Sequence, residues 1–381
     1  MQDHHSRLLS RSEFLKRTGL MTIGGSLLGL AACKSSTNQQ ASSQSQSGSL
    51  IANPVSSGQT SASGGEVVAD PTKLPRVAAD PTKLPPPPTY GSPQVHEIHL
   101  TIKEVLAEIK KGVIFRFMAL NDQVPGPMIR VRQGDVIDLH FTSDKNNKYP
   151  HNIDFHSVYG TGGGAVALMC GPGQTRHIRF KVMYPGAFIY HCAVPDLDMH
   201  ISSGMFGMMV VEPPEGLPPV DREFYLGQHE IYVKPPVNDH TEALFDMEAM
   251  LQEIPQYVVF NGAFNGLTSE RYGAMQAKQK ERVRIFFVNG GPNLSSSFHP
   301  IGNVWTRAWR DGGLANAPDK YLQTINVPPG SCAVVEMDLP IAETIVVADH
   351  AITRHARQGA SAEIQVSGNP VPEIFNEHPD A

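Results

Sequence analysis

The residues best suited to chemistry lie in the segment YHCAVPDLDMHISSGMFG at 190–207, with a second segment, PHNIDFH, at 150–156. Together they offer a thiolate, two imidazoles and a thioether within reach of one metal ion. This is the ligand set of a blue-copper electron-transfer site, because soft sulfur ligands suit copper in both of its oxidation states. The predicted ligands of this type 1 copper are His151, Cys192, His200 and Met205.

The positions of the two remaining histidines predict a second metal. Side chains along a strand alternate between its faces, so His151 and His156 point apart if their segment is extended, as do His191 and Cys192. His156 and His191 are then left together on the other face, and Asp154 shares the face of His156. Any one of these residues alone would be better explained as an unrelated core histidine or a buried thiol. Their clustering favours two metal sites joined through one peptide bond.

Composition places limits on the class of protein. The chain has 381 residues and a net charge of −6, which gives no indication of nucleic-acid binding. Its 34 glycines and 31 prolines are typical of a turn-rich all-β protein. None of the four cysteines forms a CxxC pair, so a zinc knuckle and an attached c-type haem are both excluded. Whether Cys170 and Cys332 are bonded stays open, although buried thiols are the commoner state.

The amino-terminal part is typical of export. Residues 1–33 combine a basic start with a largely apolar run and end in LAAC, which resembles the bacterial lipobox. This predicts a lipid anchor on Cys33 and a periplasmic or cell-surface location. The sequence SRSEFLK at 10–16 resembles a twin-arginine signal, but Ser12 replaces the second arginine, so the export route stays open. An uncleaved membrane anchor is the alternative.

Residues 34–90 are predicted to be a disordered linker. The first part is rich in Ser, Gln and Gly, and so has too few bulky apolar residues to form a core. ADPTKLP then occurs twice, at 69–75 and 79–85, before a run of prolines. The pattern indicates a stiff, polyproline-like spacer without chemistry of its own.

From residue 95 onward, short apolar runs alternate with turn residues, which predicts β-sandwiches or Greek-key barrels. The order of motifs repeats after residue 221, and His350 of the second copy stands where Cys192 stands in the first. We therefore predict an all-β protein with two tandem barrels, at 91–215 and 216–381. Because PGPMIRVRQGDVIDLHF at 125–141 resembles the cupredoxin strand that precedes the first copper histidine, both barrels are expected to be cupredoxin-like. Short helices are expected at 241–254 and 268–280.

The two ligand segments resemble those of the copper-containing nitrite reductases, in particular the branch with the shorter ligand loop. The resemblance covers most of residues 95–368. It implies one-electron reduction of nitrite to nitric oxide, with electrons passing from a type 1 to a type 2 copper, two coppers per chain. It also implies a homotrimer in which the type 2 site is shared between subunits. The type 2 ligands would be His156, His191 and, by the match of DHA at 349–351, His350.

The same resemblance extends to the residues that would handle protons and substrate. His299 in FHPIG matches the catalytic histidine of the family, and Ile301 matches the apolar residue that crowds nitrite. Asp154 is placed beside the second metal by strand alternation, as a proton relay or as a carboxylate that orients the ligands. The family implies a small cupredoxin or a c-type cytochrome as electron donor. Denitrification and detoxification stay open as purposes.

Two other classes of protein share parts of this pattern. A two-domain laccase-like multicopper oxidase also duplicates this fold, but its trinuclear cluster needs several HxH pairs and an HCH motif. This chain has HCA at 191–193 and no HxH in its cupredoxin region. A non-enzymatic blue-copper carrier needs only the type 1 ligands, and so leaves the second set of histidines unexplained.

Overall fold

The computed structural model describes residues 65–89, 91–377 and 379. The predicted export signal, the lipidation site Cys33 and the first part of the predicted linker therefore lie outside the described residues. In the described part of the chain, no helix has both the length and the apolar character needed to cross a membrane.

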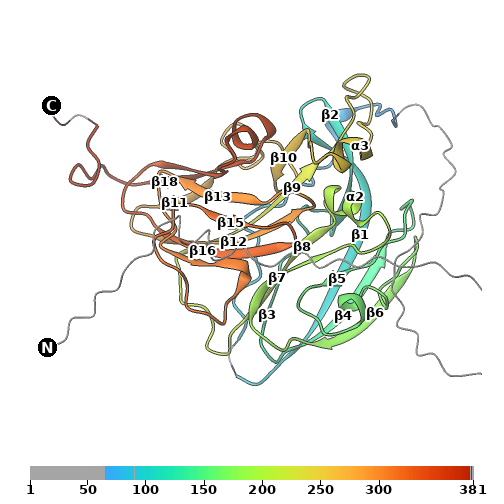
Figure 1. The fold of residues 1–381 in the computed structure, drawn as a ribbon, viewed down its shortest axis with the longest axis horizontal. Helices are drawn as coiled ribbons and strands as arrows, with labels where there is room; N and C mark the ends of the chain where they lie inside the picture. The colour runs from blue at the N-terminus through green and yellow to red at the C-terminus, as the bar shows by residue number, and fades with distance from the viewer. Residues whose placement is uncertain (1–64, 90, 378, 380–381) are drawn as a thin grey trace, which may run out of the picture. The chain divides into compact units, whose positions relative to one another are not determined.

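Two four-stranded sheets form the first half of the described chain (Figure 1). One has the order β2 (Val113–Leu120), β1 (Val95–Lys110), β4 (Val136–Ser143) and β6 (Thr175–Lys181). The other has the order β3 (Ile129–Arg132), β8 (Phe206–Glu212), β7 (Gly186–His191) and β5 (Asp154–Phe155). Strand β4 shows why they pack as a sandwich: Ile137, Leu139 and Phe141 alternate with more exposed residues and point into a common core.

The second half repeats this plan with two five-stranded sheets. One has the order β10 (Tyr257–Phe260), β9 (Arg222–Ile231), β12 (Arg282–Gly291), β16 (Ser331–Asp338) and β14 (Arg307–Trp309). The other has the order β11 (Met275–Lys278), β18 (Ser361–Ser367), β17 (Thr344–Asp349), β13 (Ser296–Ile301) and β15 (Ile325–Val327). Strand β12 lies parallel to β9 and antiparallel to β16, as β4 does to β1 and β6. The predicted all-β duplication is confirmed.

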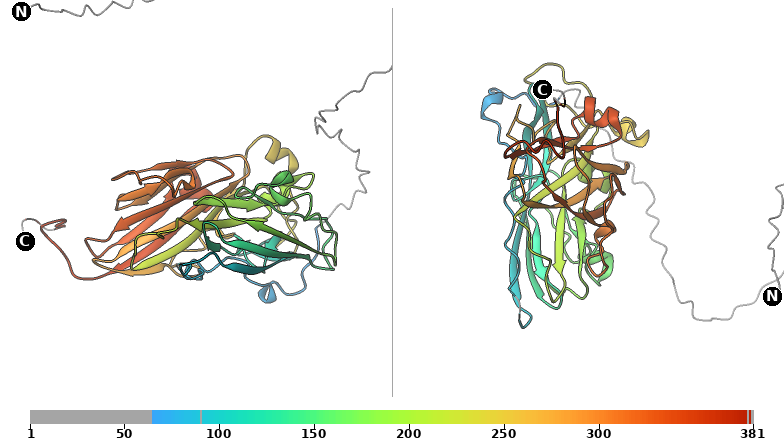
Figure 2. Two further views of the ribbon diagram at one scale, coloured as in Figure 1. Left: turned by 90° about the horizontal axis from the view of Figure 1, so that it is seen from below. Right: turned by 90° about the vertical axis from the view of Figure 1, so that its left-hand side faces the viewer.

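A third apolar core joins the two sandwiches, which lie side by side in Figure 2. Strand β7 is buried on both faces: Tyr190 points into the first core, whereas Ala187 and Ile189 point toward the second sandwich. Phe286 of β12 and Val334 of β16 belong to the same joining core. Because apolar burial is the main stabilising contribution, the two halves are held as one body.

The predicted spacer is wrong for residues 65–89, which pack on the protein. Val77 and Ala79 are buried, and Val124 exchanges backbone hydrogen bonds with both. Pro81 accepts a further bond from the Tyr225 N–H at 2.9 Å, which ties the segment to β9. The low apolar content of the segment gave no sign of this packing. A few small apolar residues are enough to anchor a segment when the surface they cover is formed by the rest of the protein.

The helix predictions are only partly correct. Between 241 and 254 a single short helix forms, α3 (Met247–Leu251), capped by Asp246, whose side chain accepts the Ala249 N–H. Between 268 and 280 the prediction is wrong, because Met275–Lys278 forms β11 beside β18. Its residues favour helix locally, but burial of Met275 and Ala277 on one face of the sheet outweighs that preference.

Two of the short helices border the candidate site, namely α2 (Leu197–Ser202) and η2 (Thr161–Gly164). Apart from α3, the others are η1 (Pro71–Lys73), η3 (Arg310–Gly312) and η4 (Arg354–Gln358). Cys170 and Cys332 are both free and buried, so no disulfide joins them.

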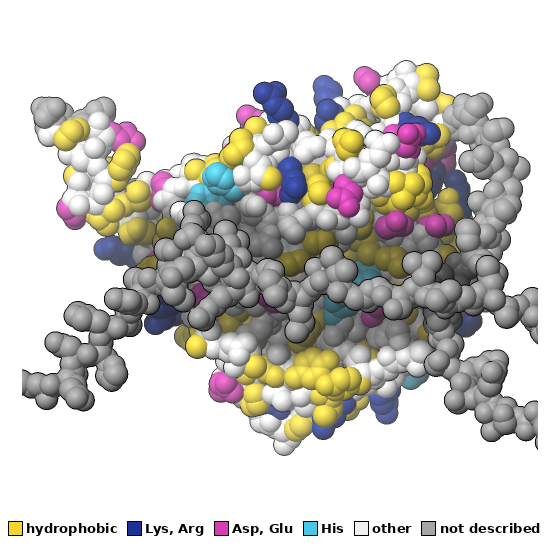
Figure 3. Space-filling view, in the orientation of Figure 1, with side chains coloured by type: hydrophobic (Ala, Val, Ile, Leu, Met, Phe, Trp, Pro, Cys, Tyr) yellow, Lys and Arg dark blue, Asp and Glu magenta, His cyan; other side chains and the backbone are white. Residues whose placement is uncertain are grey.

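On the face seen in Figure 3, basic and acidic side chains are interspersed where the surface is described.

Candidate metal centre

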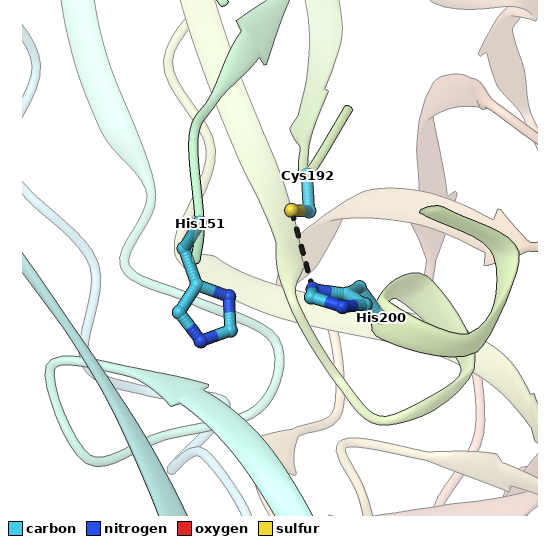
Figure 4. A group of neighbouring side chains, drawn as sticks. All are labelled: His151, Cys192 and His200. Carbon is cyan, nitrogen blue, oxygen red and sulfur yellow. Dashed lines mark hydrogen bonds between the residues drawn. The ribbon is translucent and has the colours of Figure 1, made fainter. Parts of the chain in front are cut away.

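Three side chains from three segments meet at the end of the first sandwich: His151 precedes β5, Cys192 follows β7, and His200 lies in α2 (Figure 4). We call them the thiolate group. Cys192 Sγ lies 3.4 Å from His200 Nδ1, and the potential ligand atoms of all three lie within 4.8 Å of one another. All three residues are buried, and His151 Nδ1 has no hydrogen-bond partner. A buried nitrogen without a hydrogen-bond partner is costly unless another group, such as a metal ion, binds its lone pair.

Backbone hydrogen bonds hold the thiolate group in place. His151 exchanges two bonds with Cys170, at 2.9 and 2.8 Å. The Cys192 N–H donates to the Met205 carbonyl at 3.2 Å, and the Met205 N–H donates to the His200 carbonyl at 3.0 Å. Met205 is fully buried in the same core cluster as Cys192. The sequence-predicted axial ligand is therefore next to the predicted thiolate.

Glu104 of β1 orients the His151 ring. Its Oε1 accepts the N–H groups of Lys148 and Tyr149 at 2.7 and 2.9 Å and lies 3.3 Å from His151 Nε2. Burial by itself would raise the pKa of Glu104, but these hydrogen bonds outweigh it and hold the pKa below its ordinary value. The ionised carboxylate therefore keeps the proton of His151 on Nε2 and leaves Nδ1 free as a ligand.

The surroundings of the other two members also suit a metal. Burial, followed by the proximity of His151, lowers the pKa of His200 to about 3, so its imidazole is neutral, as a ligand must be. Burial raises the pKa of the Cys192 thiol, with the N–H of Asn152 acting in the opposite direction. A bound cation would favour the thiolate form. Asn152 also accepts the Ala193 N–H at 2.7 Å, which joins the two ligand loops.

On the other face of β7, His191 meets His156, and we call these two the imidazole pair. Their Nε2 atoms are 3.1 Å apart. His191 Nδ1 lies 2.8 Å from the Cys192 carbonyl, to which it donates, so His191 Nε2 keeps its lone pair for a ligand. Desolvation by the surrounding protein, followed by the proximity of His191, lowers the pKa of His156. A shared cation satisfies both nitrogens, whereas two neutral lone pairs would repel.

Asp154 completes this second group. It stands directly opposite His191 in the β5–β7 pairing, and its carboxylate lies within 4.8 Å of both imidazole nitrogens. Gly163 of η2 makes room for it, because a Cβ at that position would fall 1.9 Å from Asp154 Oδ1. The backbone of Gly163 also has a φ of +56°, which few residues other than glycine adopt.

The remaining predicted residues gather at the edge of the second sandwich. His299 of β13 and His350, which follows β17, have ring centroids 5.0 Å apart. His299 Nδ1 donates to the Gln323 carbonyl at 2.6 Å, so its Nε2 is left for other contacts. Ile301 follows on the same strand with 36% of its surface exposed. Among the described residues, the group around the imidazole pair includes Asp154 but not His350.

Asp349 fixes the turn that carries His350. Its buried carboxylate accepts the N–H groups of Ser297 and Ala351, both at 3.0 Å, and pairs with Arg354 at 2.9 Å. The His350 N–H in turn donates to the Ser297 carbonyl at 2.7 Å. The backbone of His350 is thus held while its side chain remains exposed.

Comparison with known proteins identifies the family. A copper-containing nitrite reductase of Neisseria meningitidis serogroup A is 41% identical over 275 residues, covering 72% of this chain and 70% of that protein. One from Cereibacter sphaeroides is 32% identical, covering 78% and 85% of the two chains. The chain belongs to the copper-containing nitrite reductases. A family model described as multicopper oxidase also matches residues 101–216.

Comparison with solved structures points to the same family. A copper nitrite reductase from Nitrosomonas europaea aligns with a TM-score of 0.65 and 35% identity, over 73% of this chain and 96% of that one. A copper-containing nitrite reductase from Thermus scotoductus SA-01 gives 0.62 and 25%, over 72% of this chain and 62% of that one. A structure described as a multicopper oxidase gives 0.61 and 26%, over 72% and 89%.

Copper, the metal implied by membership of the copper-containing nitrite reductases, fits the residues present. The thiolate group offers a soft sulfur, the unpartnered His151 Nδ1 and the neutral His200, which together suit copper. The imidazole pair offers two facing nitrogens in a more open setting.

Sequence reasoning missed several supporting residues in this copper-containing nitrite reductase. Asn152 and Asp349 each adjoin a predicted ligand, and so their polar side chains were a usable signal. Gly163 lies in a glycine run that could have been read as a loop making room for a neighbour. Glu104 had no local signal, because it meets His151 across 47 residues of sequence.

Proposed function

We propose that this chain reduces nitrite to nitric oxide with two coppers per chain. The type 1 copper is held by the thiolate group with Met205, and the type 2 copper by the imidazole pair with His350. Nitrite takes up one electron and two protons, one N–O bond breaks, and the leaving oxygen departs as water. The observation that carries the proposal is that adjacent residues, His191 and Cys192, face two different groups of potential ligands.

Copper held by the thiolate group with Met205 and by the imidazole pair with His350 would supply the one-electron redox chemistry. The chain supplies the connection between the sites, because one peptide bond joins His191 to Cys192. A hydrogen bond of 2.8 Å from His191 Nδ1 to the Cys192 carbonyl adds to it. The two groups thus meet at the end of β7, where His191 is the last residue of the strand and Cys192 is the next.

Protons are handled by two residues of this chain. Asp154 would relay a proton through its carboxylate beside the imidazole pair, in the space left by Gly163. His299 would relay one through Nε2, because its Nδ1–H is already donated to the Gln323 carbonyl. Ile301 follows His299 by two residues, so its apolar side chain lies on the same face of β13 and would restrict the space open to nitrite and water.

We infer that the type 2 site is shared between subunits of a homotrimer. Asp154, His156 and His191 form one exposed half-site, and His299 with His350 forms another at the edge of the second sandwich. Two imidazoles are too few to hold a catalytic copper that keeps one position open for substrate. Joining the half-sites of neighbouring chains supplies the third.

Replacement of His350 tests both the activity and the sharing. His350→Ala should keep the blue colour, lose most of the second copper and lose nitrite reduction. Mixing it with His156→Ala should recover activity once subunits exchange, because some interfaces then hold all three histidines. His240→Ala, at an exposed histidine outside both half-sites, is the control. Inactive mixed trimers, with wild-type trimers surviving the same treatment, would exclude a shared site.

The alternative functions account for less of the structure. Among the described residues, only Asp154 joins the imidazole pair as a further candidate ligand, whereas a laccase-like cluster needs several histidine pairs. A blue-copper carrier gives no role to the facing Nε2 atoms of the imidazole pair. Measuring nitric oxide formed from nitrite by copper-loaded protein separates the three functions.

We also propose that the protein is exported and lipidated on Cys33, and that a small cupredoxin or a c-type cytochrome donates the electron. The lipobox-like LAAC supports the anchor, and family membership supports the donor. Mass spectrometry of protein purified from membranes should find lipid on Cys33. An unlipidated mature terminus elsewhere would exclude the anchor.

A further inference from the structure

A second concentration of potential metal ligands lies on the outer face of the first sandwich. Strands β1, β4 and β6 turn their apolar residues inward, as Leu139 and Phe141 of β4 do. His140 and Asp138 alternate with these residues and therefore point outward. This face carries no residue of the thiolate group or of the imidazole pair.

Three histidines form a row across these strands, and we call them the histidine row: His99, His140 and His177. His99 is paired with His140 in the parallel β1–β4 register, and His140 with His177 in the antiparallel β4–β6 register. Their rings are stacked, with centroids 4.8 and 4.3 Å apart. The row is thus set by the register of three strands, because residues opposite each other in a sheet have neighbouring side chains.

Carboxylates flank the histidine row two residues earlier on two strands. Glu97 Oε1 lies 3.0 Å from His99 Nε2 and 3.7 Å from His140 Nε2. Asp138 contacts His177 and Arg179. The structure therefore holds two overlapping groups of three potential ligands, one with Glu97 and one with Asp138, which share His140.

Charge balance distinguishes the two groups. Asp138 already has the Arg179 guanidinium as its partner, and a metal ion would have to displace it. Glu97 is paired, among the described residues, with imidazoles alone and has no Lys or Arg partner there. Its carboxylate therefore has no fixed cation that a metal ion would have to displace.

We propose that Glu97, His99 and His140 bind a divalent transition-metal ion in addition to the two coppers. Imidazole and carboxylate ligands suit Cu²⁺ and Zn²⁺, and Cu²⁺ binds most tightly to such a set. The side chains of Glu97, His99 and His140 are 67%, 65% and 31% exposed, so the ion enters from solvent and keeps water ligands. It exchanges freely, unlike an ion in the buried thiolate group.

The test is a calorimetric titration with Zn²⁺ of protein that holds two coppers per chain, after more weakly bound copper has been removed by dialysis. The wild type should bind one more Zn²⁺ per chain than His140→Gln or Glu97→Gln, or bind it at least about tenfold more tightly. Cu²⁺ should displace this Zn²⁺. Nitrite reduction should be the same in all three proteins, because none of the changes touches the proposed copper ligands.

Two control variants make the assignment specific. His177→Gln removes the far end of the histidine row, and His240→Gln removes an exposed histidine elsewhere; both should retain the Zn²⁺. Anomalous diffraction at the zinc edge should place the ion beside His140. The proposal is overturned if wild type and His140→Gln bind equally, or if His177→Gln loses the ion while Glu97→Gln keeps it. An ion located anywhere else would also overturn it.

Discussion

Replacing Glu104 by glutamine tests how the protein would present His151 to the proposed type 1 copper. The carboxylate is almost fully buried and accepts hydrogen bonds from the N–H groups of Lys148 and Tyr149, in addition to its contact with His151 Nε2 at 3.3 Å. Glutamine keeps the size of the side chain, and its carbonyl oxygen can still accept from the backbone. The change therefore removes the charge while leaving the loop in place.

The expected magnitude follows from the single bond to His151. A hydrogen bond to a charged group contributes about 1.5–3 kcal/mol and a neutral one about 0.5–1.5 kcal/mol, a difference of roughly 1–1.5 kcal/mol. Each 1.4 kcal/mol or so corresponds to about tenfold in affinity. We therefore expect Glu104→Gln to bind the type 1 copper about tenfold more weakly, within the range of about 10–100-fold typical of residues that support a ligand.

In the assay, a chelator competes with the protein for copper, and the intensity of the visible thiolate-to-copper band reports how much copper the protein retains. Glu108→Gln is the matched control, because Glu108 lies on the same strand, accepts the Gly112 N–H at 2.9 Å and belongs to neither copper group. Both variants should keep the native circular dichroism spectrum. Copper retention by Glu104→Gln equal to that of wild type would show that the carboxylate does not position His151, and would refute the reasoning.

Three further predictions follow from the same structure. Cys192→Ser should abolish the visible band while type 2 copper, measured by paramagnetic resonance, stays bound; a retained band would reject the type 1 assignment. Nitrite reduction should be favoured by acid, and Asp154→Asn and His299→Ala should each lower steady-state turnover by about 10²–10⁴-fold, so near-normal rates would remove them from the mechanism. Burial lowers the pKa of His229 to about 4, so only the unfolded chain takes up this proton as pH falls below about 6.5. Stability should then fall by about 2 kcal/mol between pH 7 and pH 5, and His229→Gln should lack that part of the loss in denaturant unfolding; equal losses would contradict it.

The sequence by itself determined the two-faced arrangement of the candidate ligands. Alternation along a strand is a local property, so the spacing of His151 from His156 and the adjacency of His191 and Cys192 were enough to separate two groups. The repeated order of motifs likewise predicted the second sandwich and placed His350 after the strand equivalent to β7. The structure reproduces that placement with β17 ending at Asp349.

Only the tertiary structure decided which distant residues support these groups. Glu104 meets His151 because β1 runs beside the loop that follows β4, a contact that neither segment specifies alone. Val77 and Ala79 are buried because the surface they cover is assembled from both sandwiches, and Met275 lies in a strand because β18 offers an edge to pair with. Such contacts depend on the packing of whole sheets, whereas local patterns report only which way neighbouring side chains point.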